Sequence, residues 1–183
     1  MRIDFGKQSF MYPMPVLIIA TYDENGKPDA MNAAWGGIHD TNQVGICIDS
    51  SHKTAANLKL KKAFTVSFGD AAHVKQCDYL GMVSGNKEPD KLKKAGFTVS
   101  KSDFVDAPII NELPMCLECE LVSYDESTGA MVGNIINVSA DEDVVSFGKI
   151  DPSKIKPITY DPVNKKYITL GEIAGDAFSV REM

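Results

Sequence analysis

Alternating apolar and polar residues, broken by short turn sequences, run through the first half of the chain and predict strands. Three segments rich in β-branched and aromatic residues fit this pattern, namely Pro15–Tyr22, Gln43–Asp49 and Ala63–Phe68. Asp29–Trp35 is expected to return beside the first of them, because Asp23-Glu24-Asn25-Gly26 contains an Asn-Gly pair that suits the primed hairpin turns. The first half is therefore predicted to form mostly antiparallel strands.

The second half returns to the same pattern. Met115–Tyr124 and Met131–Ser139 alternate, and Asp125–Gly129 between them is typical of a hairpin loop. Residues 151–164 carry three prolines and are expected to be mostly loop. Tyr167–Gly171 is predicted to be a short final strand.

Three short helices are expected between the strands. Serines followed by good helix formers predict a helix within Ser50–Leu60, entered from the end of a strand. A second helix is expected from Asp70 through Cys77, and a third around Pro89–Ala95, where Gly96 is a suitable C-terminal cap.

These elements predict the fold class. Six to eight strands against two or three short helices, without regular strand–helix alternation, favour a mainly β protein. Closing an antiparallel sheet into a barrel removes its exposed edges, so a β-barrel with helices over its openings is the expected architecture. No repeat, linker or low-complexity tract is visible, and residues 1–183 are interpreted as a single domain.

Charge and hydropathy narrow the possible partners. The chain has 183 residues and a formal net charge of −6, which disfavours non-specific nucleic-acid binding. The lysine clusters Lys59–Lys62 and Lys91–Lys94 are interpreted as solvated helix faces. The longest clean apolar run, Val16–Ala20, is far shorter than the roughly 20 residues of a membrane span. Met1–Asp4 does not begin a secretory signal, so the expected location is the cytoplasm.

Several kinds of chemistry lack their motifs. There is no glycine-rich dinucleotide or P-loop fingerprint, no G-x-S-x-G and no H-E-x-x-H. His39, His52 and His73 are too scattered to predict a metal site. Cys116 and Cys119 form a C-x-x-C sequence, but residues three apart on a strand point to opposite faces, so buried free thiols are expected.

Three segments remain as candidates for ligand binding, each with a structural alternative. Ser50–Thr54 offers backbone amides, hydroxyls and a lysine to a phosphate, although an ordinary N-cap would also explain its serines. Ala30–Gly37 combines small residues with Trp35, which suits either a flat heterocycle or core packing. Ser84–Lys91 is a polar loop that either reaches a ligand or is simply solvated.

The order and spacing of these segments resemble the flavin reductase-like family of FMN-binding split barrels over nearly the whole chain. The motifs that carry the resemblance are Tyr12–Val16, Asn32–Trp35, Ser51–Thr54, Phe64–Ser67, Ser84-Gly85 followed by Asp90-Lys91, Ala107–Ile110, Pro157–Tyr160 and Tyr167–Gly171. The resemblance implies an FMN-binding split β-barrel and a homodimer, with non-covalent FMN in a groove near the subunit interface.

The resemblance also implies which residues contact the cofactor. Asn32, Ala33, Ala34 and Trp35 would line the isoalloxazine ring. Ser51, Lys53 and Thr54 would hold the ribityl phosphate, within a cofactor-binding segment that also contains Ser50 and His52. Lys91 and its loop would close over the cofactor, and Ser67 stands where relatives often have Asn. No catalytic acid or base and no metal ligand is assigned.

The resemblance implies an oxidoreductase that transfers electrons through FMN, which accepts them from several kinds of donor. A flavin reductase would take hydride from a reduced nicotinamide, whereas a non-enzymatic flavin electron carrier would take electrons from a small iron protein. A third alternative is an FMN-binding module without turnover. Neither nucleic acid nor membrane is expected as a partner.

Overall fold

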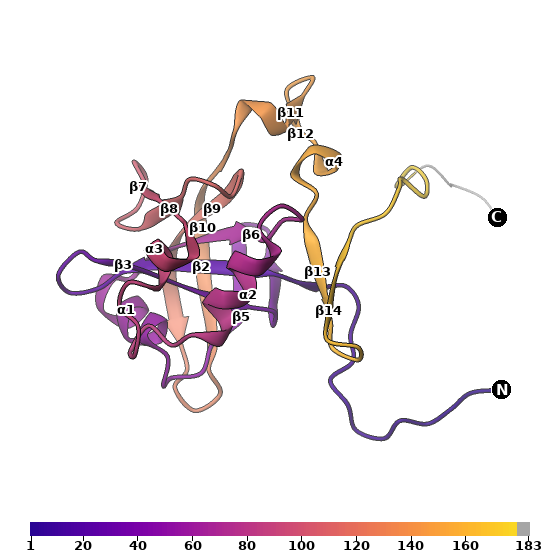
Figure 1. Cartoon of the computed structure of the whole chain (residues 1–183), viewed down its shortest axis with the longest axis horizontal. Helices are drawn as coiled ribbons and strands as arrows, with labels where there is room; N and C mark the ends of the chain where they lie inside the picture. The colour runs from indigo at the N-terminus through magenta and orange to yellow at the C-terminus, as the bar shows by residue number, and fades with distance from the viewer. Residues whose placement is uncertain (179–183) are drawn as a thin grey trace.

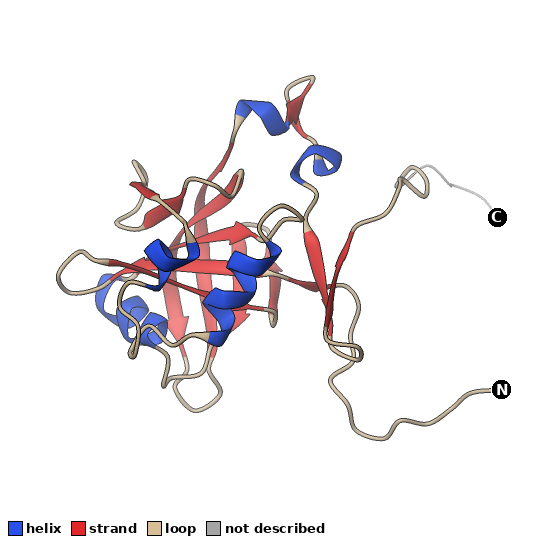
Figure 2. Cartoon of the chain, viewed as in Figure 1, coloured by secondary structure: helices blue, strands red, loops and turns tan. Residues whose placement is uncertain are grey.

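A curled, seven-stranded antiparallel sheet forms the centre of the protein, which is described for residues 1–178 by a computed structural model (Figures 1 and 2). In sheet order its strands are β3 (Pro28–Ala33), β2 (Leu17–Tyr22), β6 (Ala63–Phe68), β9 (Met115–Tyr124), β10 (Ala130–Ala140), β5 (Gln43–Cys47) and β4 (Gly36–Asp40). This half-barrel confirms the predicted mainly β, split-barrel fold class.

The concave side of the sheet holds one hydrophobic core. Leu17, Ile19, Phe64 and Val66 are at most 3% exposed and pack in one cluster with residues of β5, β9 and β10. Helix α1 (Lys53–Lys61) adds its buried apolar face to this cluster and so covers one side of the barrel.

A second core lies on the convex side of β2 and β3. Helices α2 (Val74–Met82) and α3 (Lys91–Ala95) pack there, with Cys77, Leu80 and Leu92 against Ile18 and Ala30. Because both faces of β2 are covered, its residues are buried without the alternation of a half-exposed strand. No helix within residues 1–178 has the length and apolar character needed to cross a membrane.

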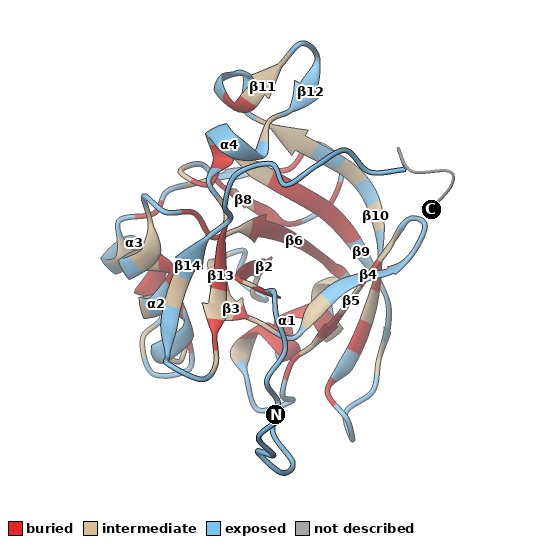
Figure 3. Ribbon diagram, turned by 90° about the vertical axis from the view of Figure 1, so that its right-hand side faces the viewer, coloured by how far each residue is buried: buried red, intermediate tan, exposed pale blue. Residues whose placement is uncertain are grey.

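Smaller elements surround the barrel. They are the three-stranded sheet of β1 (Met14–Pro15), β13 (Ile158–Asp161) and β14 (Lys166–Thr169), the hairpin of β7 (Val99–Lys101) and β8 (Pro108–Ile110), the hairpin of β11 (Val145–Ser146) and β12 (Lys149–Ile150), a 3₁₀ turn at Glu142–Val144 and helix α4 (Pro152–Ile155). The N- and C-terminal segments run along or away from the body and are exposed (Figure 3).

Several predicted elements are confirmed. β6 and β9 have the predicted bounds, and β10 differs from its prediction by one residue at each end. Asp125–Gly129 is the hairpin loop between β9 and β10. Gly96 caps α3 in the left-handed conformation, with φ of 83°. These elements were predictable because their pattern and their turn residues agree.

Other predictions are wrong in part. Residues 151–164 are not mostly loop, because they contain α4 and β13, and β13 pairs with both β1 and β14. The prolines lie outside the paired positions of β13, so they did not prevent the strand. The strand predicted over Asp29–Trp35 ends at Ala33, and a separate strand, β4, begins at Gly36 beside β5.

The ends of the helices and one turn also differ. α1 begins at Lys53 with His52 as N-cap and without a side-chain cap, so the serines do not cap it. α2 begins at Val74, four residues after the predicted start, because Asp70 accepts hydrogen bonds from His73 in a preceding turn. In the Asp23–Gly26 turn only Gly26 has a positive φ. The turn is therefore not of type I′, which needs a positive φ at both central residues.

The C-x-x-C cysteines lie on opposite faces of β9, as predicted. Cys119 points into the concave core, whereas Cys116 is buried outside that cluster. Both are free thiols, as are Cys47 and Cys77. Burial raises the pKa of Cys116 to about 11 and that of Cys119 to about 12, so both are protonated at neutral pH.

Candidate functional site

A groove lies between α1, the end of β3, α2 and the β13–β14 hairpin. It consists of two adjoining cavities, of about 110 Å³ and about 230 Å³, that share Gly81 and Met82 as lining residues. We call the smaller cavity the closed end, and its polar residues are Asp29, His52, Lys53, Thr54, Ser84 and Lys91. We call the larger cavity the open end, and it is lined by Val16, Asn32, Ala34, Asp78, Tyr160 and Tyr167. The two ends bring together most of the residues that the sequence predicted.

The first turn of α1 presents unbonded backbone amides at the closed end. The amides of Ala55 and Ala56 donate to the carbonyl of His52, at 3.1 and 3.4 Å. Within residues 1–178, the amides of Lys53 and Thr54 have no hydrogen-bond acceptor, and no acidic side chain lies in the first turn. Two free N–H groups at a helix N-terminus are suited to an anion such as a phosphate.

Lys53 supplies a cation beside these amides, but it is already paired. Its ammonium lies 3.3 Å from a carboxylate oxygen of Asp23, and the two side chains are 17% and 15% exposed. Burial raises the pKa of Asp23, but hydrogen bonds from the amides of Lys27 and Asn25, together with Lys53, bring it below its usual value. An anion at the closed end would therefore share Lys53 with Asp23.

Asp29 and Lys91 form a buried ion pair in the wall of the closed end. Lys91 Nζ lies 3.7 Å from Asp29 Oδ1, and the side chains are 4% and 2% exposed. The Thr54 hydroxyl donates to Asp29 Oδ2 at 3.0 Å, and Lys91 Nζ donates to the Val83 carbonyl at 3.2 Å. Lys91 is thus not on a solvated helix face, which corrects that interpretation of the Lys91–Lys94 cluster.

Burial lowers the pKa of Lys91, while the neighbouring carboxylate of Asp29 partly opposes this change. Gly85 allows the loop to close on the pair, because a Cβ atom there would lie only 2.3 Å from Asp29 Oδ1. The Ser84-Gly85 and Asp90-Lys91 motif therefore has a structural role, which is to bring the loop and α3 against β3.

Of the other predicted residues of the phosphate segment, His52 lines the closed end, whereas Ser50 and Ser51 do not. Ser51 is exposed, and its hydroxyl donates to Asp49 Oδ1 at 2.6 Å. This hydrogen bond is the main reason that the pKa of Asp49 is lowered. His52 lines the closed end through its place as the N-cap of α1, whereas Ser50 is exposed and does not line it.

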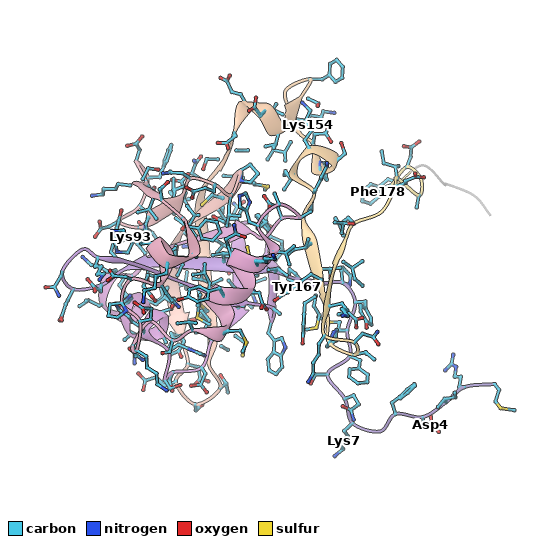
Figure 4. All side chains as sticks on the ribbon, viewed as in Figure 1. Asp4, Lys7, Lys93, Lys154, Tyr167 and Phe178 are labelled. Atoms are coloured by element: carbon cyan, nitrogen blue, oxygen red, sulfur yellow. The ribbon has the colours of Figure 1, made fainter. Side chains whose placement is uncertain are left out.

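The open end combines small residues with a tyrosine pair. Asn32 donates from Nδ2 to the Cys77 carbonyl at 3.1 Å, which leaves its carbonyl oxygen without a partner among the described residues. Tyr167 projects from β14 toward α2, where its hydroxyl donates to Asp78 at 2.8 Å (Figure 4). Burial and the bond to Asp78 raise the pKa of Tyr167. The rings of Tyr160 and Tyr167 lie 5.9 Å apart.

Trp35 and Ala33 do not line the groove. Trp35 is 58% exposed, so it is not a core residue, and its carbonyl accepts from the Cys47 amide at 2.8 Å. Trp35 instead lines another cavity, of about 690 Å³, between β4, β5, β10 and the N-terminal segment. Ala33 belongs to the concave core.

Ser67 lies on the convex side of β6 and is fully buried, and its hydroxyl has no hydrogen-bond partner within residues 1–178. It does not line the groove.

The sequence did not single out three lining residues of the groove, Asp29, Asp78 and Tyr160, or Asp23, which pairs with Lys53. Asp29 was seen only as the start of a strand and Asp23 only as part of a turn, and neither Asp78 nor Tyr160 was singled out for a site. Carboxylates are abundant in this chain, and only the fold shows that Asp29 faces Thr54 and Lys91, which follow it by 25 and 62 positions. The motif containing Lys91 did point to an acidic partner, because a lysine that is buried in the fold is almost always paired with a carboxylate.

Comparison with known proteins gives consistent matches. The model of the flavin reductase like domain matches residues 9–160. The structure of flavoredoxin from Desulfovibrio vulgaris (Miyazaki F) is 32% identical, with a TM-score of 0.95 and complete coverage of both chains. Flavoredoxin from Methanosarcina acetivorans is 30% identical, with a TM-score of 0.88 over 98% of this chain and 96% of that one.

Two more distant matches complete the comparison. An FMN-binding domain of a flavin reductases-like enzyme from Shewanella baltica shares the fold, with a TM-score of 0.80, 18% identity and 88% coverage of each chain. An uncharacterized protein of Aeropyrum pernix is 25% identical over 119 residues, which are 64% of this chain, and the chain spans 45% of that relative's length. The family model and the structures agree, and the chain belongs to the flavin reductase-like family.

Proposed function

We propose that the chain binds one FMN non-covalently along the groove and transfers electrons through it. The observation that carries this proposal is the pair of unbonded amides, Lys53 and Thr54, in a cavity that adjoins a second cavity lined by small and aromatic residues. A phosphate needs the first arrangement and a flat ring system needs the second. The description of the Shewanella baltica domain as FMN-binding supports the same ligand.

Bound FMN would supply the redox chemistry, and the protein would bind and orient it. The two amides would donate to the phosphate at the closed end, and Lys53 would add positive charge beside them. At the open end, Ala34 and Gly81 leave space for the ring, and the free carbonyl oxygen of Asn32 is available to an N–H group of its edge.

We further propose that the chain is an oxidoreductase that receives electrons from a reduced nicotinamide or a small iron protein. The family contains flavin reductases, which favours a nicotinamide. The two flavoredoxin structures favour the second candidate, an electron carrier, because flavoredoxin is one.

The working unit is proposed to be a homodimer. The N-terminal segment exposes Ile3, Phe5 and Phe10, and the C-terminal segment exposes Ile173 and Phe178 (Figure 4). Apolar side chains on segments that leave the body suit burial against a second copy. Light scattering on purified protein is expected to give twice the chain mass of 19.9 kDa, and a monomer would contradict the proposal.

Titration of the protein with FMN, followed by flavin fluorescence, tests the binding site. Lys53→Ala is expected to weaken binding by about 2 kcal/mol, because a charge-assisted contact is lost. Lys59→Ala is the matched control, since Lys59 lies in the same helix but pairs with Glu126, and it should leave the dissociation constant unchanged. Equal dissociation constants for the wild type and Lys53→Ala would reject the proposed phosphate site.

The donor is tested with the FMN-loaded protein under anaerobic conditions. Rapid loss of the flavin absorbance with NADH or NADPH would identify a flavin reductase. Reduction only by a reduced ferredoxin or rubredoxin would identify an electron carrier. If neither donor reduces the flavin, the proposed electron transfer is wrong and only flavin binding remains.

A further inference from the structure

We infer that Asp29 is a positioning residue, whose buried carboxylate holds the first turn of α1 so that the amides of Lys53 and Thr54 meet the phosphate of the flavin. The inference rests on the proposed function, because it concerns the same groove. A negative charge close to a phosphate would be expected to weaken phosphate binding by repulsion, whereas the inference is that Asp29 strengthens it.

The two oxygens of the Asp29 carboxylate are bound to different elements. Oδ2 accepts the hydroxyl of Thr54, the second residue of α1, at 3.0 Å, and Oδ1 lies 3.7 Å from the ammonium of Lys91 in α3. Asp29 itself is in β3 and is 2% exposed. One carboxylate thus fixes the start of α1 relative to the central sheet.

The same group connects to the opposite wall of the groove. Lys91 also donates to the carbonyl of Val83, directly after α2, at 3.2 Å. Gly85 in the following loop packs so closely on Asp29 that a Cβ atom would lie 2.3 Å from its Oδ1. The spacing between α1 and the end of α2, which is the width of the closed end, therefore depends on Asp29.

The hydrogen bond from Thr54 also decides how that residue meets the ligand. Because its hydroxyl donates to Asp29, Thr54 has only its amide left to offer to the phosphate. A hydroxyl that bonded the phosphate directly would leave Asp29 without this donor and with its charge facing an anion.

Asp29→Asn separates the two possible roles by the sign of its effect. If Asp29 is a positioning residue, loss of its pairing with Lys91 and of its charge-assisted bond to Thr54 weakens FMN binding, by roughly 10- to 100-fold. If Asp29 is only a nearby negative charge, its neutralisation tightens FMN binding, and that result would overturn the inference.

Riboflavin, which lacks the phosphate, shows whether the loss concerns the phosphate alone. For Asp29→Asn the riboflavin dissociation constant is expected to change far less than that of FMN. Similar losses for both ligands would indicate general damage to the fold and would also overturn the inference. If the wild type binds neither ligand, the proposed function itself fails.

Thr54→Val keeps the test decisive if Asp29→Asn does not fold. It removes one hydroxyl, alters no charge, and is expected to lower FMN affinity while sparing riboflavin, with recovery in Thr54→Ser. An unchanged ratio of the two affinities in Thr54→Val would overturn the inference while leaving wild-type flavin binding intact.

Asp23→Asn is the matched control, because it makes the same chemical change at the same end of the groove. Within residues 1–178, Asp23 accepts hydrogen bonds from Lys53 and from the amides of Asn25 and Lys27 and from no amide of α1, so its neutralisation should free Lys53 for the phosphate and tighten FMN binding. Opposite signs for Asp29→Asn and Asp23→Asn are the expected result, and equal signs would contradict the positioning role.

Discussion

The closed end of the groove contains a fully buried ion pair, whereas the polar and aromatic side chains of the open end are half-buried or exposed. Asp29 and Lys91 are each less than 5% exposed and join β3, α1, α3 and the end of α2. At the open end, Tyr167 bonds the exposed Asp78, and the Tyr160 and Tyr167 side chains are only half-buried. The comparison teaches that the end suited to a charged group is rigidly built, and that the end suited to a ring and a redox partner is more tolerant of change.

The largest effect is expected for Lys91→Met, which leaves Asp29 buried without its cation. Breaking a buried ion pair on one side costs about 3 kcal/mol of the free energy of unfolding, measured by urea denaturation. Lys93→Met, two residues along α3 on an exposed side chain (Figure 4), should change it by less than about 0.5 kcal/mol. Equal stabilities of the two variants would show that the closed end is no more rigid than the surface.

A smaller loss is expected for Gly85→Ala. The new methyl group would collide with Asp29 Oδ1, because Thr54 and Lys91 hold this carboxylate in place. The free energy of unfolding should fall by about 2 kcal/mol. Gly37→Ala is the control, because no atom lies within 4 Å of a Cβ at Gly37 in the exposed part of β4. Thermal unfolding of both variants tests this, and an unaffected Gly85→Ala protein would mean that Asp29 moves freely.

At the open end, Tyr167→Phe removes the hydrogen bond to Asp78. We expect the free energy of unfolding to fall by about 0.5 kcal/mol, because Asp78 is exposed and water can replace the tyrosine hydroxyl as its donor. Tyr160→Phe should cost less still, since the Tyr160 hydroxyl has no partner among the described residues. A loss in urea denaturation as large as that of Lys91→Met would abolish the distinction between the two ends.

The smallest effect is expected from acid at the β13–β14 hairpin that lines the open end. Hydrogen bonds, first of all from the Tyr12 hydroxyl, lower the pKa of Asp161 from 3.8 to about 2. The depressed value means that this stabilisation is present above pH 3.8 and is lost as the pH falls toward 2. The difference in melting temperature between the wild type and Asp161→Asn should therefore shrink over this range, and a constant difference would contradict it.

The fold was predictable where local pattern and tertiary position agree. The sequences of β6 and β9 have strand-like patterns with clear boundaries, and the structure has both strands with the predicted bounds. β4 was missed because Gly36-Gly37 has low strand propensity, and it exists because β5 offers it a pairing edge. β4 therefore forms because of its pairing in the assembled sheet, and this pairing cannot be predicted from the local sequence.

The candidate site was predictable as segments but not as a network. The Ser51–Thr54 segment does begin a helix beside a cavity, and Lys91 does lie close to it. The sequence assigned the side chains of Ser51 and Thr54 to a ligand, whereas the structure bonds them to Asp49 and Asp29. Short polar side chains can bond either a ligand or a nearby carboxylate, and only the folded distances decide between them.

The placement of Cys116 and Cys119 on opposite faces of β9 has a practical consequence for electron counting. Two thiols separated by the thickness of a strand cannot be oxidised to a disulfide with each other without unfolding the sheet. Cyclic oxidation and reduction of this pair therefore cannot add two electrons to a coulometric titration of the protein. A coulometric titration therefore needs no correction for a Cys116–Cys119 disulfide, and among the free thiols only Cys47 and Cys77 remain to be blocked before the electrons are assigned to a bound cofactor.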